Sequence, residues 1–355
     1  MISDLRLQQF RSYSDASYEF GPGVNIIVGP NGSGKTNLLE AILVLARGGS
    51  YRVNDLDLLQ FGATWFRLDA HMPPADSLRT VKLASEPRQV KSYELDGRTY
   101  HRLTAQHIVP IVLFEPNHLQ LLHGSPQLRR DYLDDILEQT NPGFSSFRRN
   151  YRRILAQRNA LLKRPNTPSA QELFPWNLRL SELGATITRA RAELCVQLAE
   201  RFTDIYTQIS QARTTVSIAY LPKFQLEAYE SQLLSKLENH VREDAQRGFT
   251  AYGPHREDFV VMFDGRPADE FASRGETRTA ILALKIIELQ LLEQVRDQTP
   301  LLLLDDVFSE LDGARRRALT RFLQTYQTFL TTTDADVVVK HFTDSTIIPL
   351  TRQQG

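Results

Sequence analysis

The stretch GPNGSGKT, residues 29–36, decides the fold of this 355-residue chain. It fits the phosphate-loop pattern G-x-x-x-x-G-K-[ST], in which glycines let successive backbone N–H groups turn inward around a pyrophosphate. Lys35 is expected to reach the outer phosphates, and the Thr36 hydroxyl to ligate Mg²⁺. The residues predicted to bind the nucleotide are Gly29, Pro30, Asn31, Gly32, Ser33, Gly34, Lys35 and Thr36.

The sequence on both sides of this loop has the pattern that a phosphate loop requires. VNIIV, residues 24–28, is typical of a buried strand, and TNLLEAILVL, residues 36–45, predicts a helix whose N-terminus faces the anion. Residues 1–13 alternate as a strand does. Arg11, near the end of that strand, either reaches the nucleotide or is a solvated strand-end arginine, and the pattern favours neither.

Two further stretches predict sheet. Residues 66–100 contain short β-like runs separated by turn signals such as Asp96-Gly97, which predicts antiparallel sheet laid on the nucleotide domain. Residues 108–114, IVPIVLF, predict a buried strand that starts near Pro110.

The second half of the chemistry lies near the other end of the chain. Residues 301–304 are four leucines followed by two aspartates, as in a strand of a central parallel sheet that ends in carboxylates. We expect Asp305 to hold Mg²⁺ through water and Asp306 to orient the attacking water as a base. Lys35 and Asp305 are separated by most of the chain, so an insertion is expected to occupy the gap.

The residues between them predict mainly helix. Residues 125–136 show helical period after Pro126. Residues 176–209 predict a helix roughly 50 Å long, with which a second helix over 226–241 could pair antiparallel as a short arm. A strand is expected at 259–263. The turn Ser273-Arg274-Gly275 then opens a helix through Val295, and is either an anion site or an ordinary cap.

A basic strip is predicted on one of these helices. Residues 141–165 include seven basic side chains and no acidic one, and arginine pairs repeat at a spacing of four. Such a strip either binds nucleic-acid phosphates or is a solvated face paired with acids from elsewhere. The candidate DNA-binding residues are Arg148, Arg149, Arg152 and Arg153.

Composition limits the classes of protein. Lys plus Arg and Asp plus Glu each number 42, so net charge does not indicate a polyanionic partner, which must meet a local patch. Cys195 is the one cysteine and the chain starts with polar residues, which favours a cytosolic protein without a signal peptide. No apolar stretch is long enough to span a bilayer, so no membrane partner is expected.

Taken together, these motifs resemble the ATP-binding-cassette heads of SMC and DNA-repair ATPases, and specifically the RecF family, over nearly the whole chain. The GPHR and DDVFSELD stretches are more specific than the phosphate loop alone. The motifs that carry the resemblance are Leu5-Arg6-Leu7, Phe10-Arg11-Ser12-Tyr13, GPNGSGKTNLLEAI from Gly29, Gly124-Ser125-Pro126, Arg129-Arg130, Leu133-Asp134, Gly253-Pro254-His255-Arg256, Ser273-Arg274-Gly275, Leu303-Leu304-Asp305-Asp306-Val307 and Ser309-Glu310-Leu311-Asp312.

The resemblance implies an α/β fold: an ABC-type ATPase head of the P-loop NTPase class, with an antiparallel β subdomain and an inserted helical lobe. The head would comprise residues 1–115 and 250–355, and the helical lobe with its short arm residues 116–249. Two copies would dimerise around ATP. Ser273 and Gly275 would contact the γ-phosphate held by the opposite subunit, and Asp312 would lie in the loop that crosses the interface.

The resemblance also implies a role. The ATP-bound homodimer would bind single-stranded and duplex DNA at gap junctions, and slow ATP hydrolysis by a weak, DNA-stimulated ATPase would release it. It would act with RecR and RecO to load RecA in gap repair and SOS induction, in the cytoplasm at the nucleoid.

Two departures from the pattern bear on this expectation. Glu276 stands where the signature usually has Gln, which places an anion near a phosphate site. Thr331 to Asp334 replace the histidine expected in transporter cassettes, which argues against the alternative of a membrane-transporter subunit. The other alternative is a DNA clamp that binds ATP without significant hydrolysis, since Asp306 is shorter than the glutamate usual in cassette enzymes.

Overall fold

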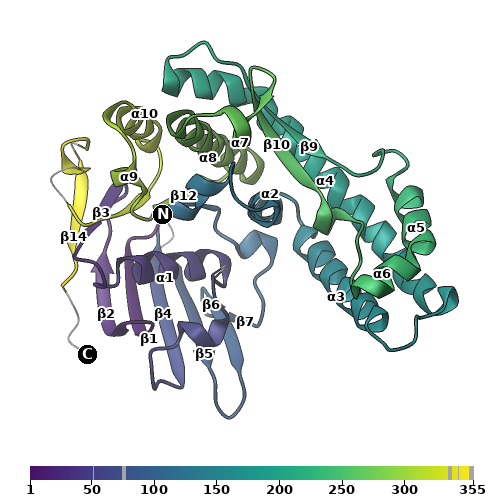
Figure 1. The fold of residues 1–355 in the computed structure, drawn as a ribbon. Coiled ribbons are helices and arrows are strands. Elements are labelled where there is room, and N and C mark those ends of the chain that lie inside the picture. The colour runs from purple at the N-terminus through teal and green to yellow at the C-terminus, as the bar shows by residue number, and fades with distance from the viewer. Residues whose placement is uncertain (51, 74–76, 335–337, 343, 352–355) are drawn as a thin grey trace. The chain divides into compact units, whose positions relative to one another are not determined.

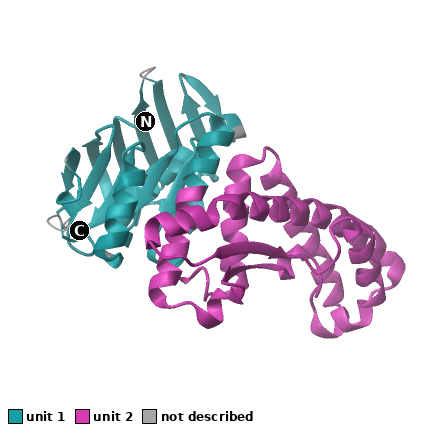
Figure 2. Cartoon of the chain, turned by 90° about the horizontal axis from the view of Figure 1, so that it is seen from above, with its two compact units in different colours: residues 1–119, 288–355 teal, residues 120–287 magenta. Residues whose placement is uncertain are grey.

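The computed structural model describes residues 1–50, 52–73, 77–334, 338–342 and 344–351. The chain forms two compact units, residues 1–119 with 288–355, and residues 120–287 (Figure 2). The first unit therefore joins both ends of the chain, as the separation of Lys35 from Asp305 led us to expect.

A parallel sheet carries the first unit. Its strands run in the order β14-β3-β13-β12-β8, and every neighbouring pair is parallel. The predicted strands at 24–28 and 301–304 are confirmed, and β13 lies between them. The predicted strand near 108–114 begins just after Pro110. The strands are β3 (Val24–Val28), β8 (Ile111–Phe114), β12 (Leu301–Leu304), β13 (Thr328–Thr332) and β14 (Ser345–Pro349).

A second sheet in this unit is antiparallel, which confirms the β subdomain. Its order is β2-β1-β4-β5-β6-β7, so β1 lies between its hairpin partner β2 and β4. The strands are β1 (Asp4–Phe10), β2 (Tyr13–Glu19), β4 (Trp65–Met72), β5 (Ser77–Ala84), β6 (Val90–Leu95) and β7 (Arg98–Tyr100).

Helix α1 (Lys35–Arg47) joins the two sheets into one core (Figure 1). Residues 38–46 of α1 are all buried, and the helix contacts strands of both sheets. A helix buried on every side needs apolar residues all round, which the run LLEAILVLA supplies apart from Glu40. Helices α9 (Val307–Glu310) and α10 (Gly313–Leu323) also belong to this unit.

The second unit is mostly helical. Helix α4 is its longest element, and α3 and α5 pack against it. A three-stranded antiparallel sheet, β11-β10-β9, also packs on α4 through β9. Its elements are α2 (Pro126–Thr140), α3 (Phe144–Leu162), α4 (Ala170–Ser210), β9 (Val216–Leu221), α5 (Tyr229–Asn239), α6 (Val241–Arg247), β10 (Asp258–Phe263), β11 (Arg266–Pro267) and α7 (Ala268–Phe271).

Helix α8 (Arg274–Arg296) starts in the second unit and ends in the first. Short 3₁₀ turns complete the fold. They are η1 (Asp55–Leu58), η2 (Ala105–His107), η3 (Pro116–Gln120) and η4 (Pro254–Arg256).

Three elements of the second unit differ from the sequence-based prediction. Helix α4 starts six residues before Trp176, at Ala170, because Ser169 and Glu172 form a reciprocal capping box there. The predicted helix over 226–241 is two helices, α5 and α6, which meet at His240 outside helical geometry. Strand β9 was missed, although its residues alternate between buried and exposed.

The missed strand β9 also changes the division of the chain. Residues 258–263 were expected to belong to the head, but β10 pairs along its whole length with β9, which lies inside the expected helical lobe. The contact-defined second unit accordingly runs from 120 to 287 rather than from 116 to 249. The division into a functional head and a helical lobe at the expected residues stays a prediction.

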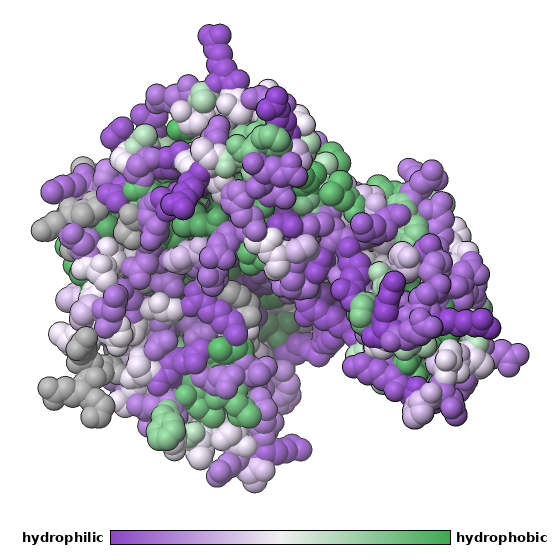
Figure 3. Space-filling view, viewed as in Figure 1, coloured by the Kyte–Doolittle hydropathy of each residue, from purple (hydrophilic) through white to green (hydrophobic). Residues whose placement is uncertain are grey.

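Hydrophobic residues on the face seen in Figure 3 form separate patches among polar ones. Within the described parts of the chain, no helix combines the length and apolar character needed to cross a bilayer.

Candidate nucleotide-binding site

The phosphate loop connects β3 to α1 with the backbone that its glycines allow. Gly32 has a φ of 80° and Gly34 a φ of 96°, both in the left-handed region that glycine adopts most readily. At Gly34 space is limiting as well, because a Cβ atom there would lie 2.9 Å from the Tyr13 hydroxyl oxygen. Gly34 is therefore required for both conformation and packing.

The turn between β1 and β2 supports the loop from one side. The Tyr13 hydroxyl donates to the Gly34 carbonyl at 3.0 Å, and Asn37 Nδ2 donates to Ser12 Oγ at 2.9 Å. Burial raises the pKa of Tyr13, so its hydroxyl stays a donor. Sequence reasoning missed Ser12 and Tyr13 as loop supports, although both belong to the quoted FRSY motif.

Arg11, in the same turn, is partly buried and hydrogen-bonded to two residues. Its Nε donates to Glu40 Oε2 at 2.8 Å, and its guanidinium also donates to the Asp57 carbonyl. The one polar residue within the buried run of α1, Glu40, is thus neutralised by Arg11. The structure excludes the solvated strand-end alternative, while contact with a nucleotide stays a prediction.

The two halves of the predicted chemistry meet at the carboxyl edge of the parallel sheet. Thr36 Oγ1 donates to Asp305 Oδ1 at 3.1 Å. Lys35 Nζ donates to the carbonyls of Gly29 and Pro30 at 2.8 and 3.3 Å, and so lies over the phosphate loop. The carboxyl ends of parallel strands share one edge, which explains how residues so far apart in sequence come together.

Thr331 fixes both aspartates. This residue lies in β13, where a transporter cassette would carry its histidine region, and its hydroxyl is buried. Thr331 Oγ1 donates to Asp305 Oδ1 at 2.9 Å and accepts from the Asp306 backbone N–H at 2.9 Å. One hydroxyl therefore sets the position of both candidate catalytic acids.

Asp306 has the geometry of a strained functional residue. Its φ of 53° lies in the left-handed region, which is uncommon for a residue with a side chain. Burial raises the pKa of its carboxyl, Lys35 opposes that shift, and the charge of Asp305 adds to it. A raised pKa suits a group that must accept a proton.

Two charged residues of this site were not predicted. An NH2 nitrogen of Arg52 contacts Asp305 Oδ2 at 3.2 Å and also contacts Glu115 Oε2. Glu115 directly follows β8, the neighbour of β12, and is buried. Its position resembles that of Asp305, an acid just after a buried strand, so the same signal could have found it.

The residues of this edge suit a nucleoside triphosphate with Mg²⁺. Ser33 Oγ in the loop is buried and has no hydrogen-bond partner among the described residues, so it is available to a phosphate oxygen. Thr36 Oγ1 and Asp305 Oδ1 supply the hard oxygen donors that Mg²⁺ prefers. The helix N-terminus at Lys35 adds favourable potential for an anion.

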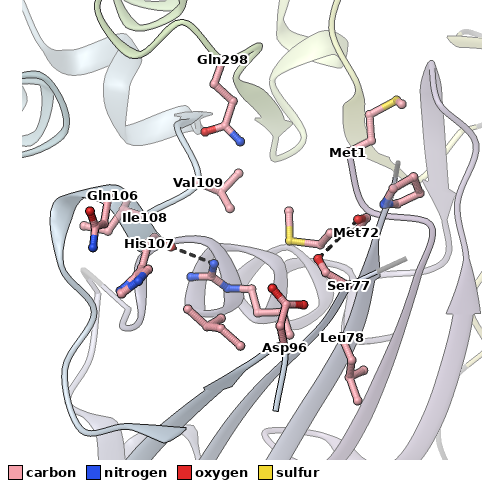
Figure 4. A pocket seen from close by; sticks show the side chains of 13 residues that line it. Met1, Met72, Ser77, Leu78, Asp96, Gln106, His107, Ile108, Val109 and Gln298 are labelled. Carbon is pink, nitrogen blue, oxygen red and sulfur yellow. Dashed lines mark hydrogen bonds between the residues drawn. The ribbon is translucent and has the colours of Figure 1, made fainter. Parts of the chain in front are cut away.

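A separate cavity in the same unit, with a volume of about 300 Å³, is lined by neither the phosphate loop nor the candidate Mg²⁺ ligands (Figure 4). It is lined by Met1, Met72 and His107 among others, and its one arginine, Arg79, donates to the carbonyls of residues 45, 46 and 107. Burial lowers the pKa of Arg79 to about 10. That guanidinium therefore caps the end of α1 and is already engaged by backbone carbonyls.

The predicted Ser273 turn lies in the second unit, at the start of α8. Ser273 is exposed, its Oγ accepts from the Glu276 N–H at 3.2 Å, and Glu276 Oε2 accepts from the Ser273 N–H at 2.8 Å. Glu276, the departure from the expected Gln, therefore completes a capping box. Contact of Ser273 or Gly275 with a phosphate stays a prediction.

Asp312 likewise acts as a helix cap. Its Oδ1 accepts from the Arg315 N–H at 3.0 Å at the start of α10, and this bond lowers the pKa of its carboxyl. About half of the Asp312 side chain is exposed, so the residue is accessible to a partner.

The basic strip on α3 needs one correction. Arg148 is mostly buried and contacts the carboxylates of Asp131, Asp134 and Glu138 at 2.6–2.8 Å, so it cannot serve as an exposed DNA contact. Arg152 is 59% exposed and lies 3.6 Å from Asp131. Arg149 and Arg153 are exposed and have no acidic partner among the described residues. The candidate strip is thus reduced to Arg149, Arg152 and Arg153.

Comparison with known proteins identifies the family of this chain. The family model for the RecF/RecN/SMC N-terminal domain matches residues 1–354. The DNA replication and repair protein RecF of Heliobacterium modesticaldum is 35% identical over 343 residues, covering 94% of this chain and 92% of the relative. That of Halalkalibacterium halodurans is 36% identical over 351 residues, covering 94% and 93%. The chain belongs to the RecF family.

Solved structures agree with this assignment. A structure of the recombination mediator protein RecF-ATPrS in the RecFOR pathway has a TM-score of 0.87 and 27% identity, covering 100% of this chain and 98% of that one. The RecF-family chain thus has the ABC-type head fold expected from the sequence, with its parallel and antiparallel sheets. The transporter-subunit alternative is set aside.

The double role of Thr331 gives a stability prediction. Thr331→Val keeps the shape but leaves the Asp306 N–H without its partner and removes a donor from Asp305. Since an unsatisfied buried polar group costs about 1–3 kcal/mol, we expect the free energy of unfolding to fall by about that amount. Urea unfolding measures it. Thr333→Val, at an exposed neighbour, is the control and should change little; equal losses in the two variants would contradict the role of Thr331.

Proposed function

We propose that this RecF-family protein is an ATP-dependent DNA-binding repair protein, in which ATP joins two copies on DNA and slow hydrolysis releases them. The observation that carries the proposal is the hydrogen-bonded set Thr36, Asp305 and Thr331 beside the phosphate loop. The relatives at 35–36% identity are DNA replication and repair proteins. One of the similar solved structures is described as RecF-ATPrS, which supports a nucleotide as the ligand.

In this proposal each residue of the site has a defined role within one copy. Lys35 would neutralise the outer phosphates, and Thr36 and Asp305 would hold Mg²⁺, directly or through water. Asp306 would orient the attacking water and accept its proton. Bound Mg²⁺ would supply neutralisation of the charge that develops on the phosphates.

A second copy would complete the site. Ser273 and Gly275 at the N-terminus of α8 would contact the γ-phosphate held by the first copy, and Asp312 would lie at the crossing. Support comes from the exposure of Ser273 and from the positive end of the helix dipole, which favours an anion at the start of α8. Arg11 would join this site if nucleotide binding draws it from Glu40.

DNA and protein partners extend the proposal. Arg149, Arg152 and Arg153 on α3 would contact DNA phosphates at junctions of single and double strands. RecR and RecO would cooperate with this protein to load RecA at gaps, in line with the RecFOR pathway of the similar structure. The place of action would be the cytoplasm at the nucleoid.

The dimerisation step gives the first test. Lys35→Ala removes the charge that binds the outer phosphates, so ATP should no longer shift the protein from one copy to two. Analytical ultracentrifugation with and without ATP measures the shift. Asp306→Asn, which keeps the phosphate loop intact, should still dimerise; a Lys35→Ala protein that dimerises with ATP as the wild type does would exclude the proposed switch.

The base assignment gives the second test. Asp306→Asn cannot accept a proton, so ATP turnover should fall by about a hundredfold or more while ATP binding persists. Because the pKa of Asp306 is raised, wild-type turnover should decline on acidification at a higher pH than an ordinary aspartate would impose. Phosphate release measured across pH tests both. Turnover at the wild-type rate in the variant would exclude Asp306 as the base.

The basic strip gives the third test. Reversing Arg149 and Arg153 to Glu should weaken binding to gapped DNA and reduce its salt dependence, since each lost phosphate contact removes counterion release. Fluorescence anisotropy at several salt concentrations measures both quantities. The matched control is the double reversal of Arg179 and Arg189, two exposed arginines on α4, which makes the same change in net charge. Equal weakening by both double variants would assign the effect to overall charge.

A further inference from the structure

The two oxygens of Asp305 have different neighbours. Oδ1 accepts from the neutral hydroxyls of Thr36 and Thr331, which hold the carboxylate without balancing its charge. Oδ2 faces Arg52, whose NH2 nitrogen lies 3.2 Å away. The side chain of Asp305 is 8% exposed, so its charge needs a nearby cation. In this structure the Arg52 guanidinium supplies it.

The same guanidinium nitrogen serves a second buried acid. It contacts Glu115 Oε2, and the Glu115 side chain is 6% exposed. The two carboxylates follow the neighbouring strands β8 and β12, so the sheet itself holds them close together. Two buried carboxylates that share one cation repel each other as soon as that cation leaves.

The surroundings strengthen this competition. The small space beside Arg52 and Asp305 is lined by four leucines together with Thr36 and Glu40, and Glu40 is paired with Arg11. Its mostly apolar wall lowers the local dielectric and makes charge interactions stronger. The leucines are Leu39, Leu43, Leu113 and Leu303. Arg52 itself is 30% exposed and lies outside regular helix and strand. Its side chain is therefore the least enclosed member of the trio and the one that can move.

We propose that Arg52 is a positioning residue of the metal site. Its guanidinium holds and neutralises Asp305 before Mg²⁺ binds, and Glu115 retains the guanidinium once Mg²⁺ takes its place at Asp305. The proposal rests on the assignment of Asp305 to Mg²⁺ under the proposed function. It assigns Glu115 the role of an acceptor that keeps the displaced arginine in the site, so that metal binding does not leave a charge unpaired.

The proposal predicts shifts of opposite sign in the Mg²⁺ requirement. Arg52→Gln removes the competing cation and should lower the Mg²⁺ concentration that half-saturates binding of a fluorescent, non-hydrolysable ATP analogue by about three- to fivefold. Glu115→Gln removes one of the two carboxylates that Arg52 contacts, so Arg52 should bind Asp305 more strongly. The half-saturating Mg²⁺ concentration should therefore rise. Titration of Mg²⁺ at fixed analogue measures both.

A second readout needs no nucleotide. Thermal unfolding of Arg52→Gln should show a lower Tm than the wild type in EDTA, and Mg²⁺ should restore more of the Tm than it does in the wild type. Arg52→Lys keeps the charge and should show less of both effects. Arg67→Gln is the matched control, because Arg67 pairs with Asp69 on the same strand, and it should not change the Mg²⁺ titration.

The outcomes separate the two levels of the account. If the wild-type protein fails to bind the analogue at any Mg²⁺ concentration, the proposed function falls and this inference with it. If the wild type binds but Arg52→Gln and Glu115→Gln shift the Mg²⁺ requirement in the same direction, or leave it unchanged, this inference alone is overturned. Glu115→Gln is nearly isosteric, so its arm decides the matter even if Arg52→Gln does not fold.

Discussion

The hydrogen bond between Thr36 and Asp305 is the interaction on which the site depends, and it joins residues 269 positions apart. The parallel sheet makes it possible, because β13 pairs with β3 on one side and β12 on the other. Without that pairing the phosphate loop would have no acid beside it. Thr331 on β13 also forms hydrogen bonds with Asp305 and with the Asp306 backbone N–H. The strand that lies between β3 and β12 therefore also positions both candidate catalytic acids.

The second unit depends on a different kind of interaction, a buried polar core. Arg191 forms a bidentate pair with Asp134, which Arg148 also contacts, and Arg158 is fully buried against Asp244. Such pairs tolerate no loss of one partner, since an unpaired buried charge is costly. They tie α2, α3 and α4 together and leave the outward arginines of α3 available for other contacts.

The sequence was sufficient where the signal is local. The phosphate loop, the strand of four leucines and the long amphipathic helix follow from spacing and composition, and the family resemblance identified the head fold. Arg148 shows where this reasoning ends, because helical spacing placed it beside Arg149 but could not reveal the acids of α2 that enclose it. Arg52 and Glu115 were missed for the same reason, since their meeting depends on strand order. Strand β9 was missed although its residues alternate between buried and exposed, which is a local signal of a strand.

The central claim is that one nucleotide is held by two copies, with Lys35 from one and Ser273 from the other. The most direct measurement mixes two defective proteins, Lys35→Ala and Ser273→Arg, and records ATP-dependent dimers and phosphate release. Each variant alone should fail, whereas the mixture should recover both, because a mixed dimer contains one site built from an intact Lys35 and an intact Ser273. A mixture that behaves as the sum of its inactive parts would contradict the shared site.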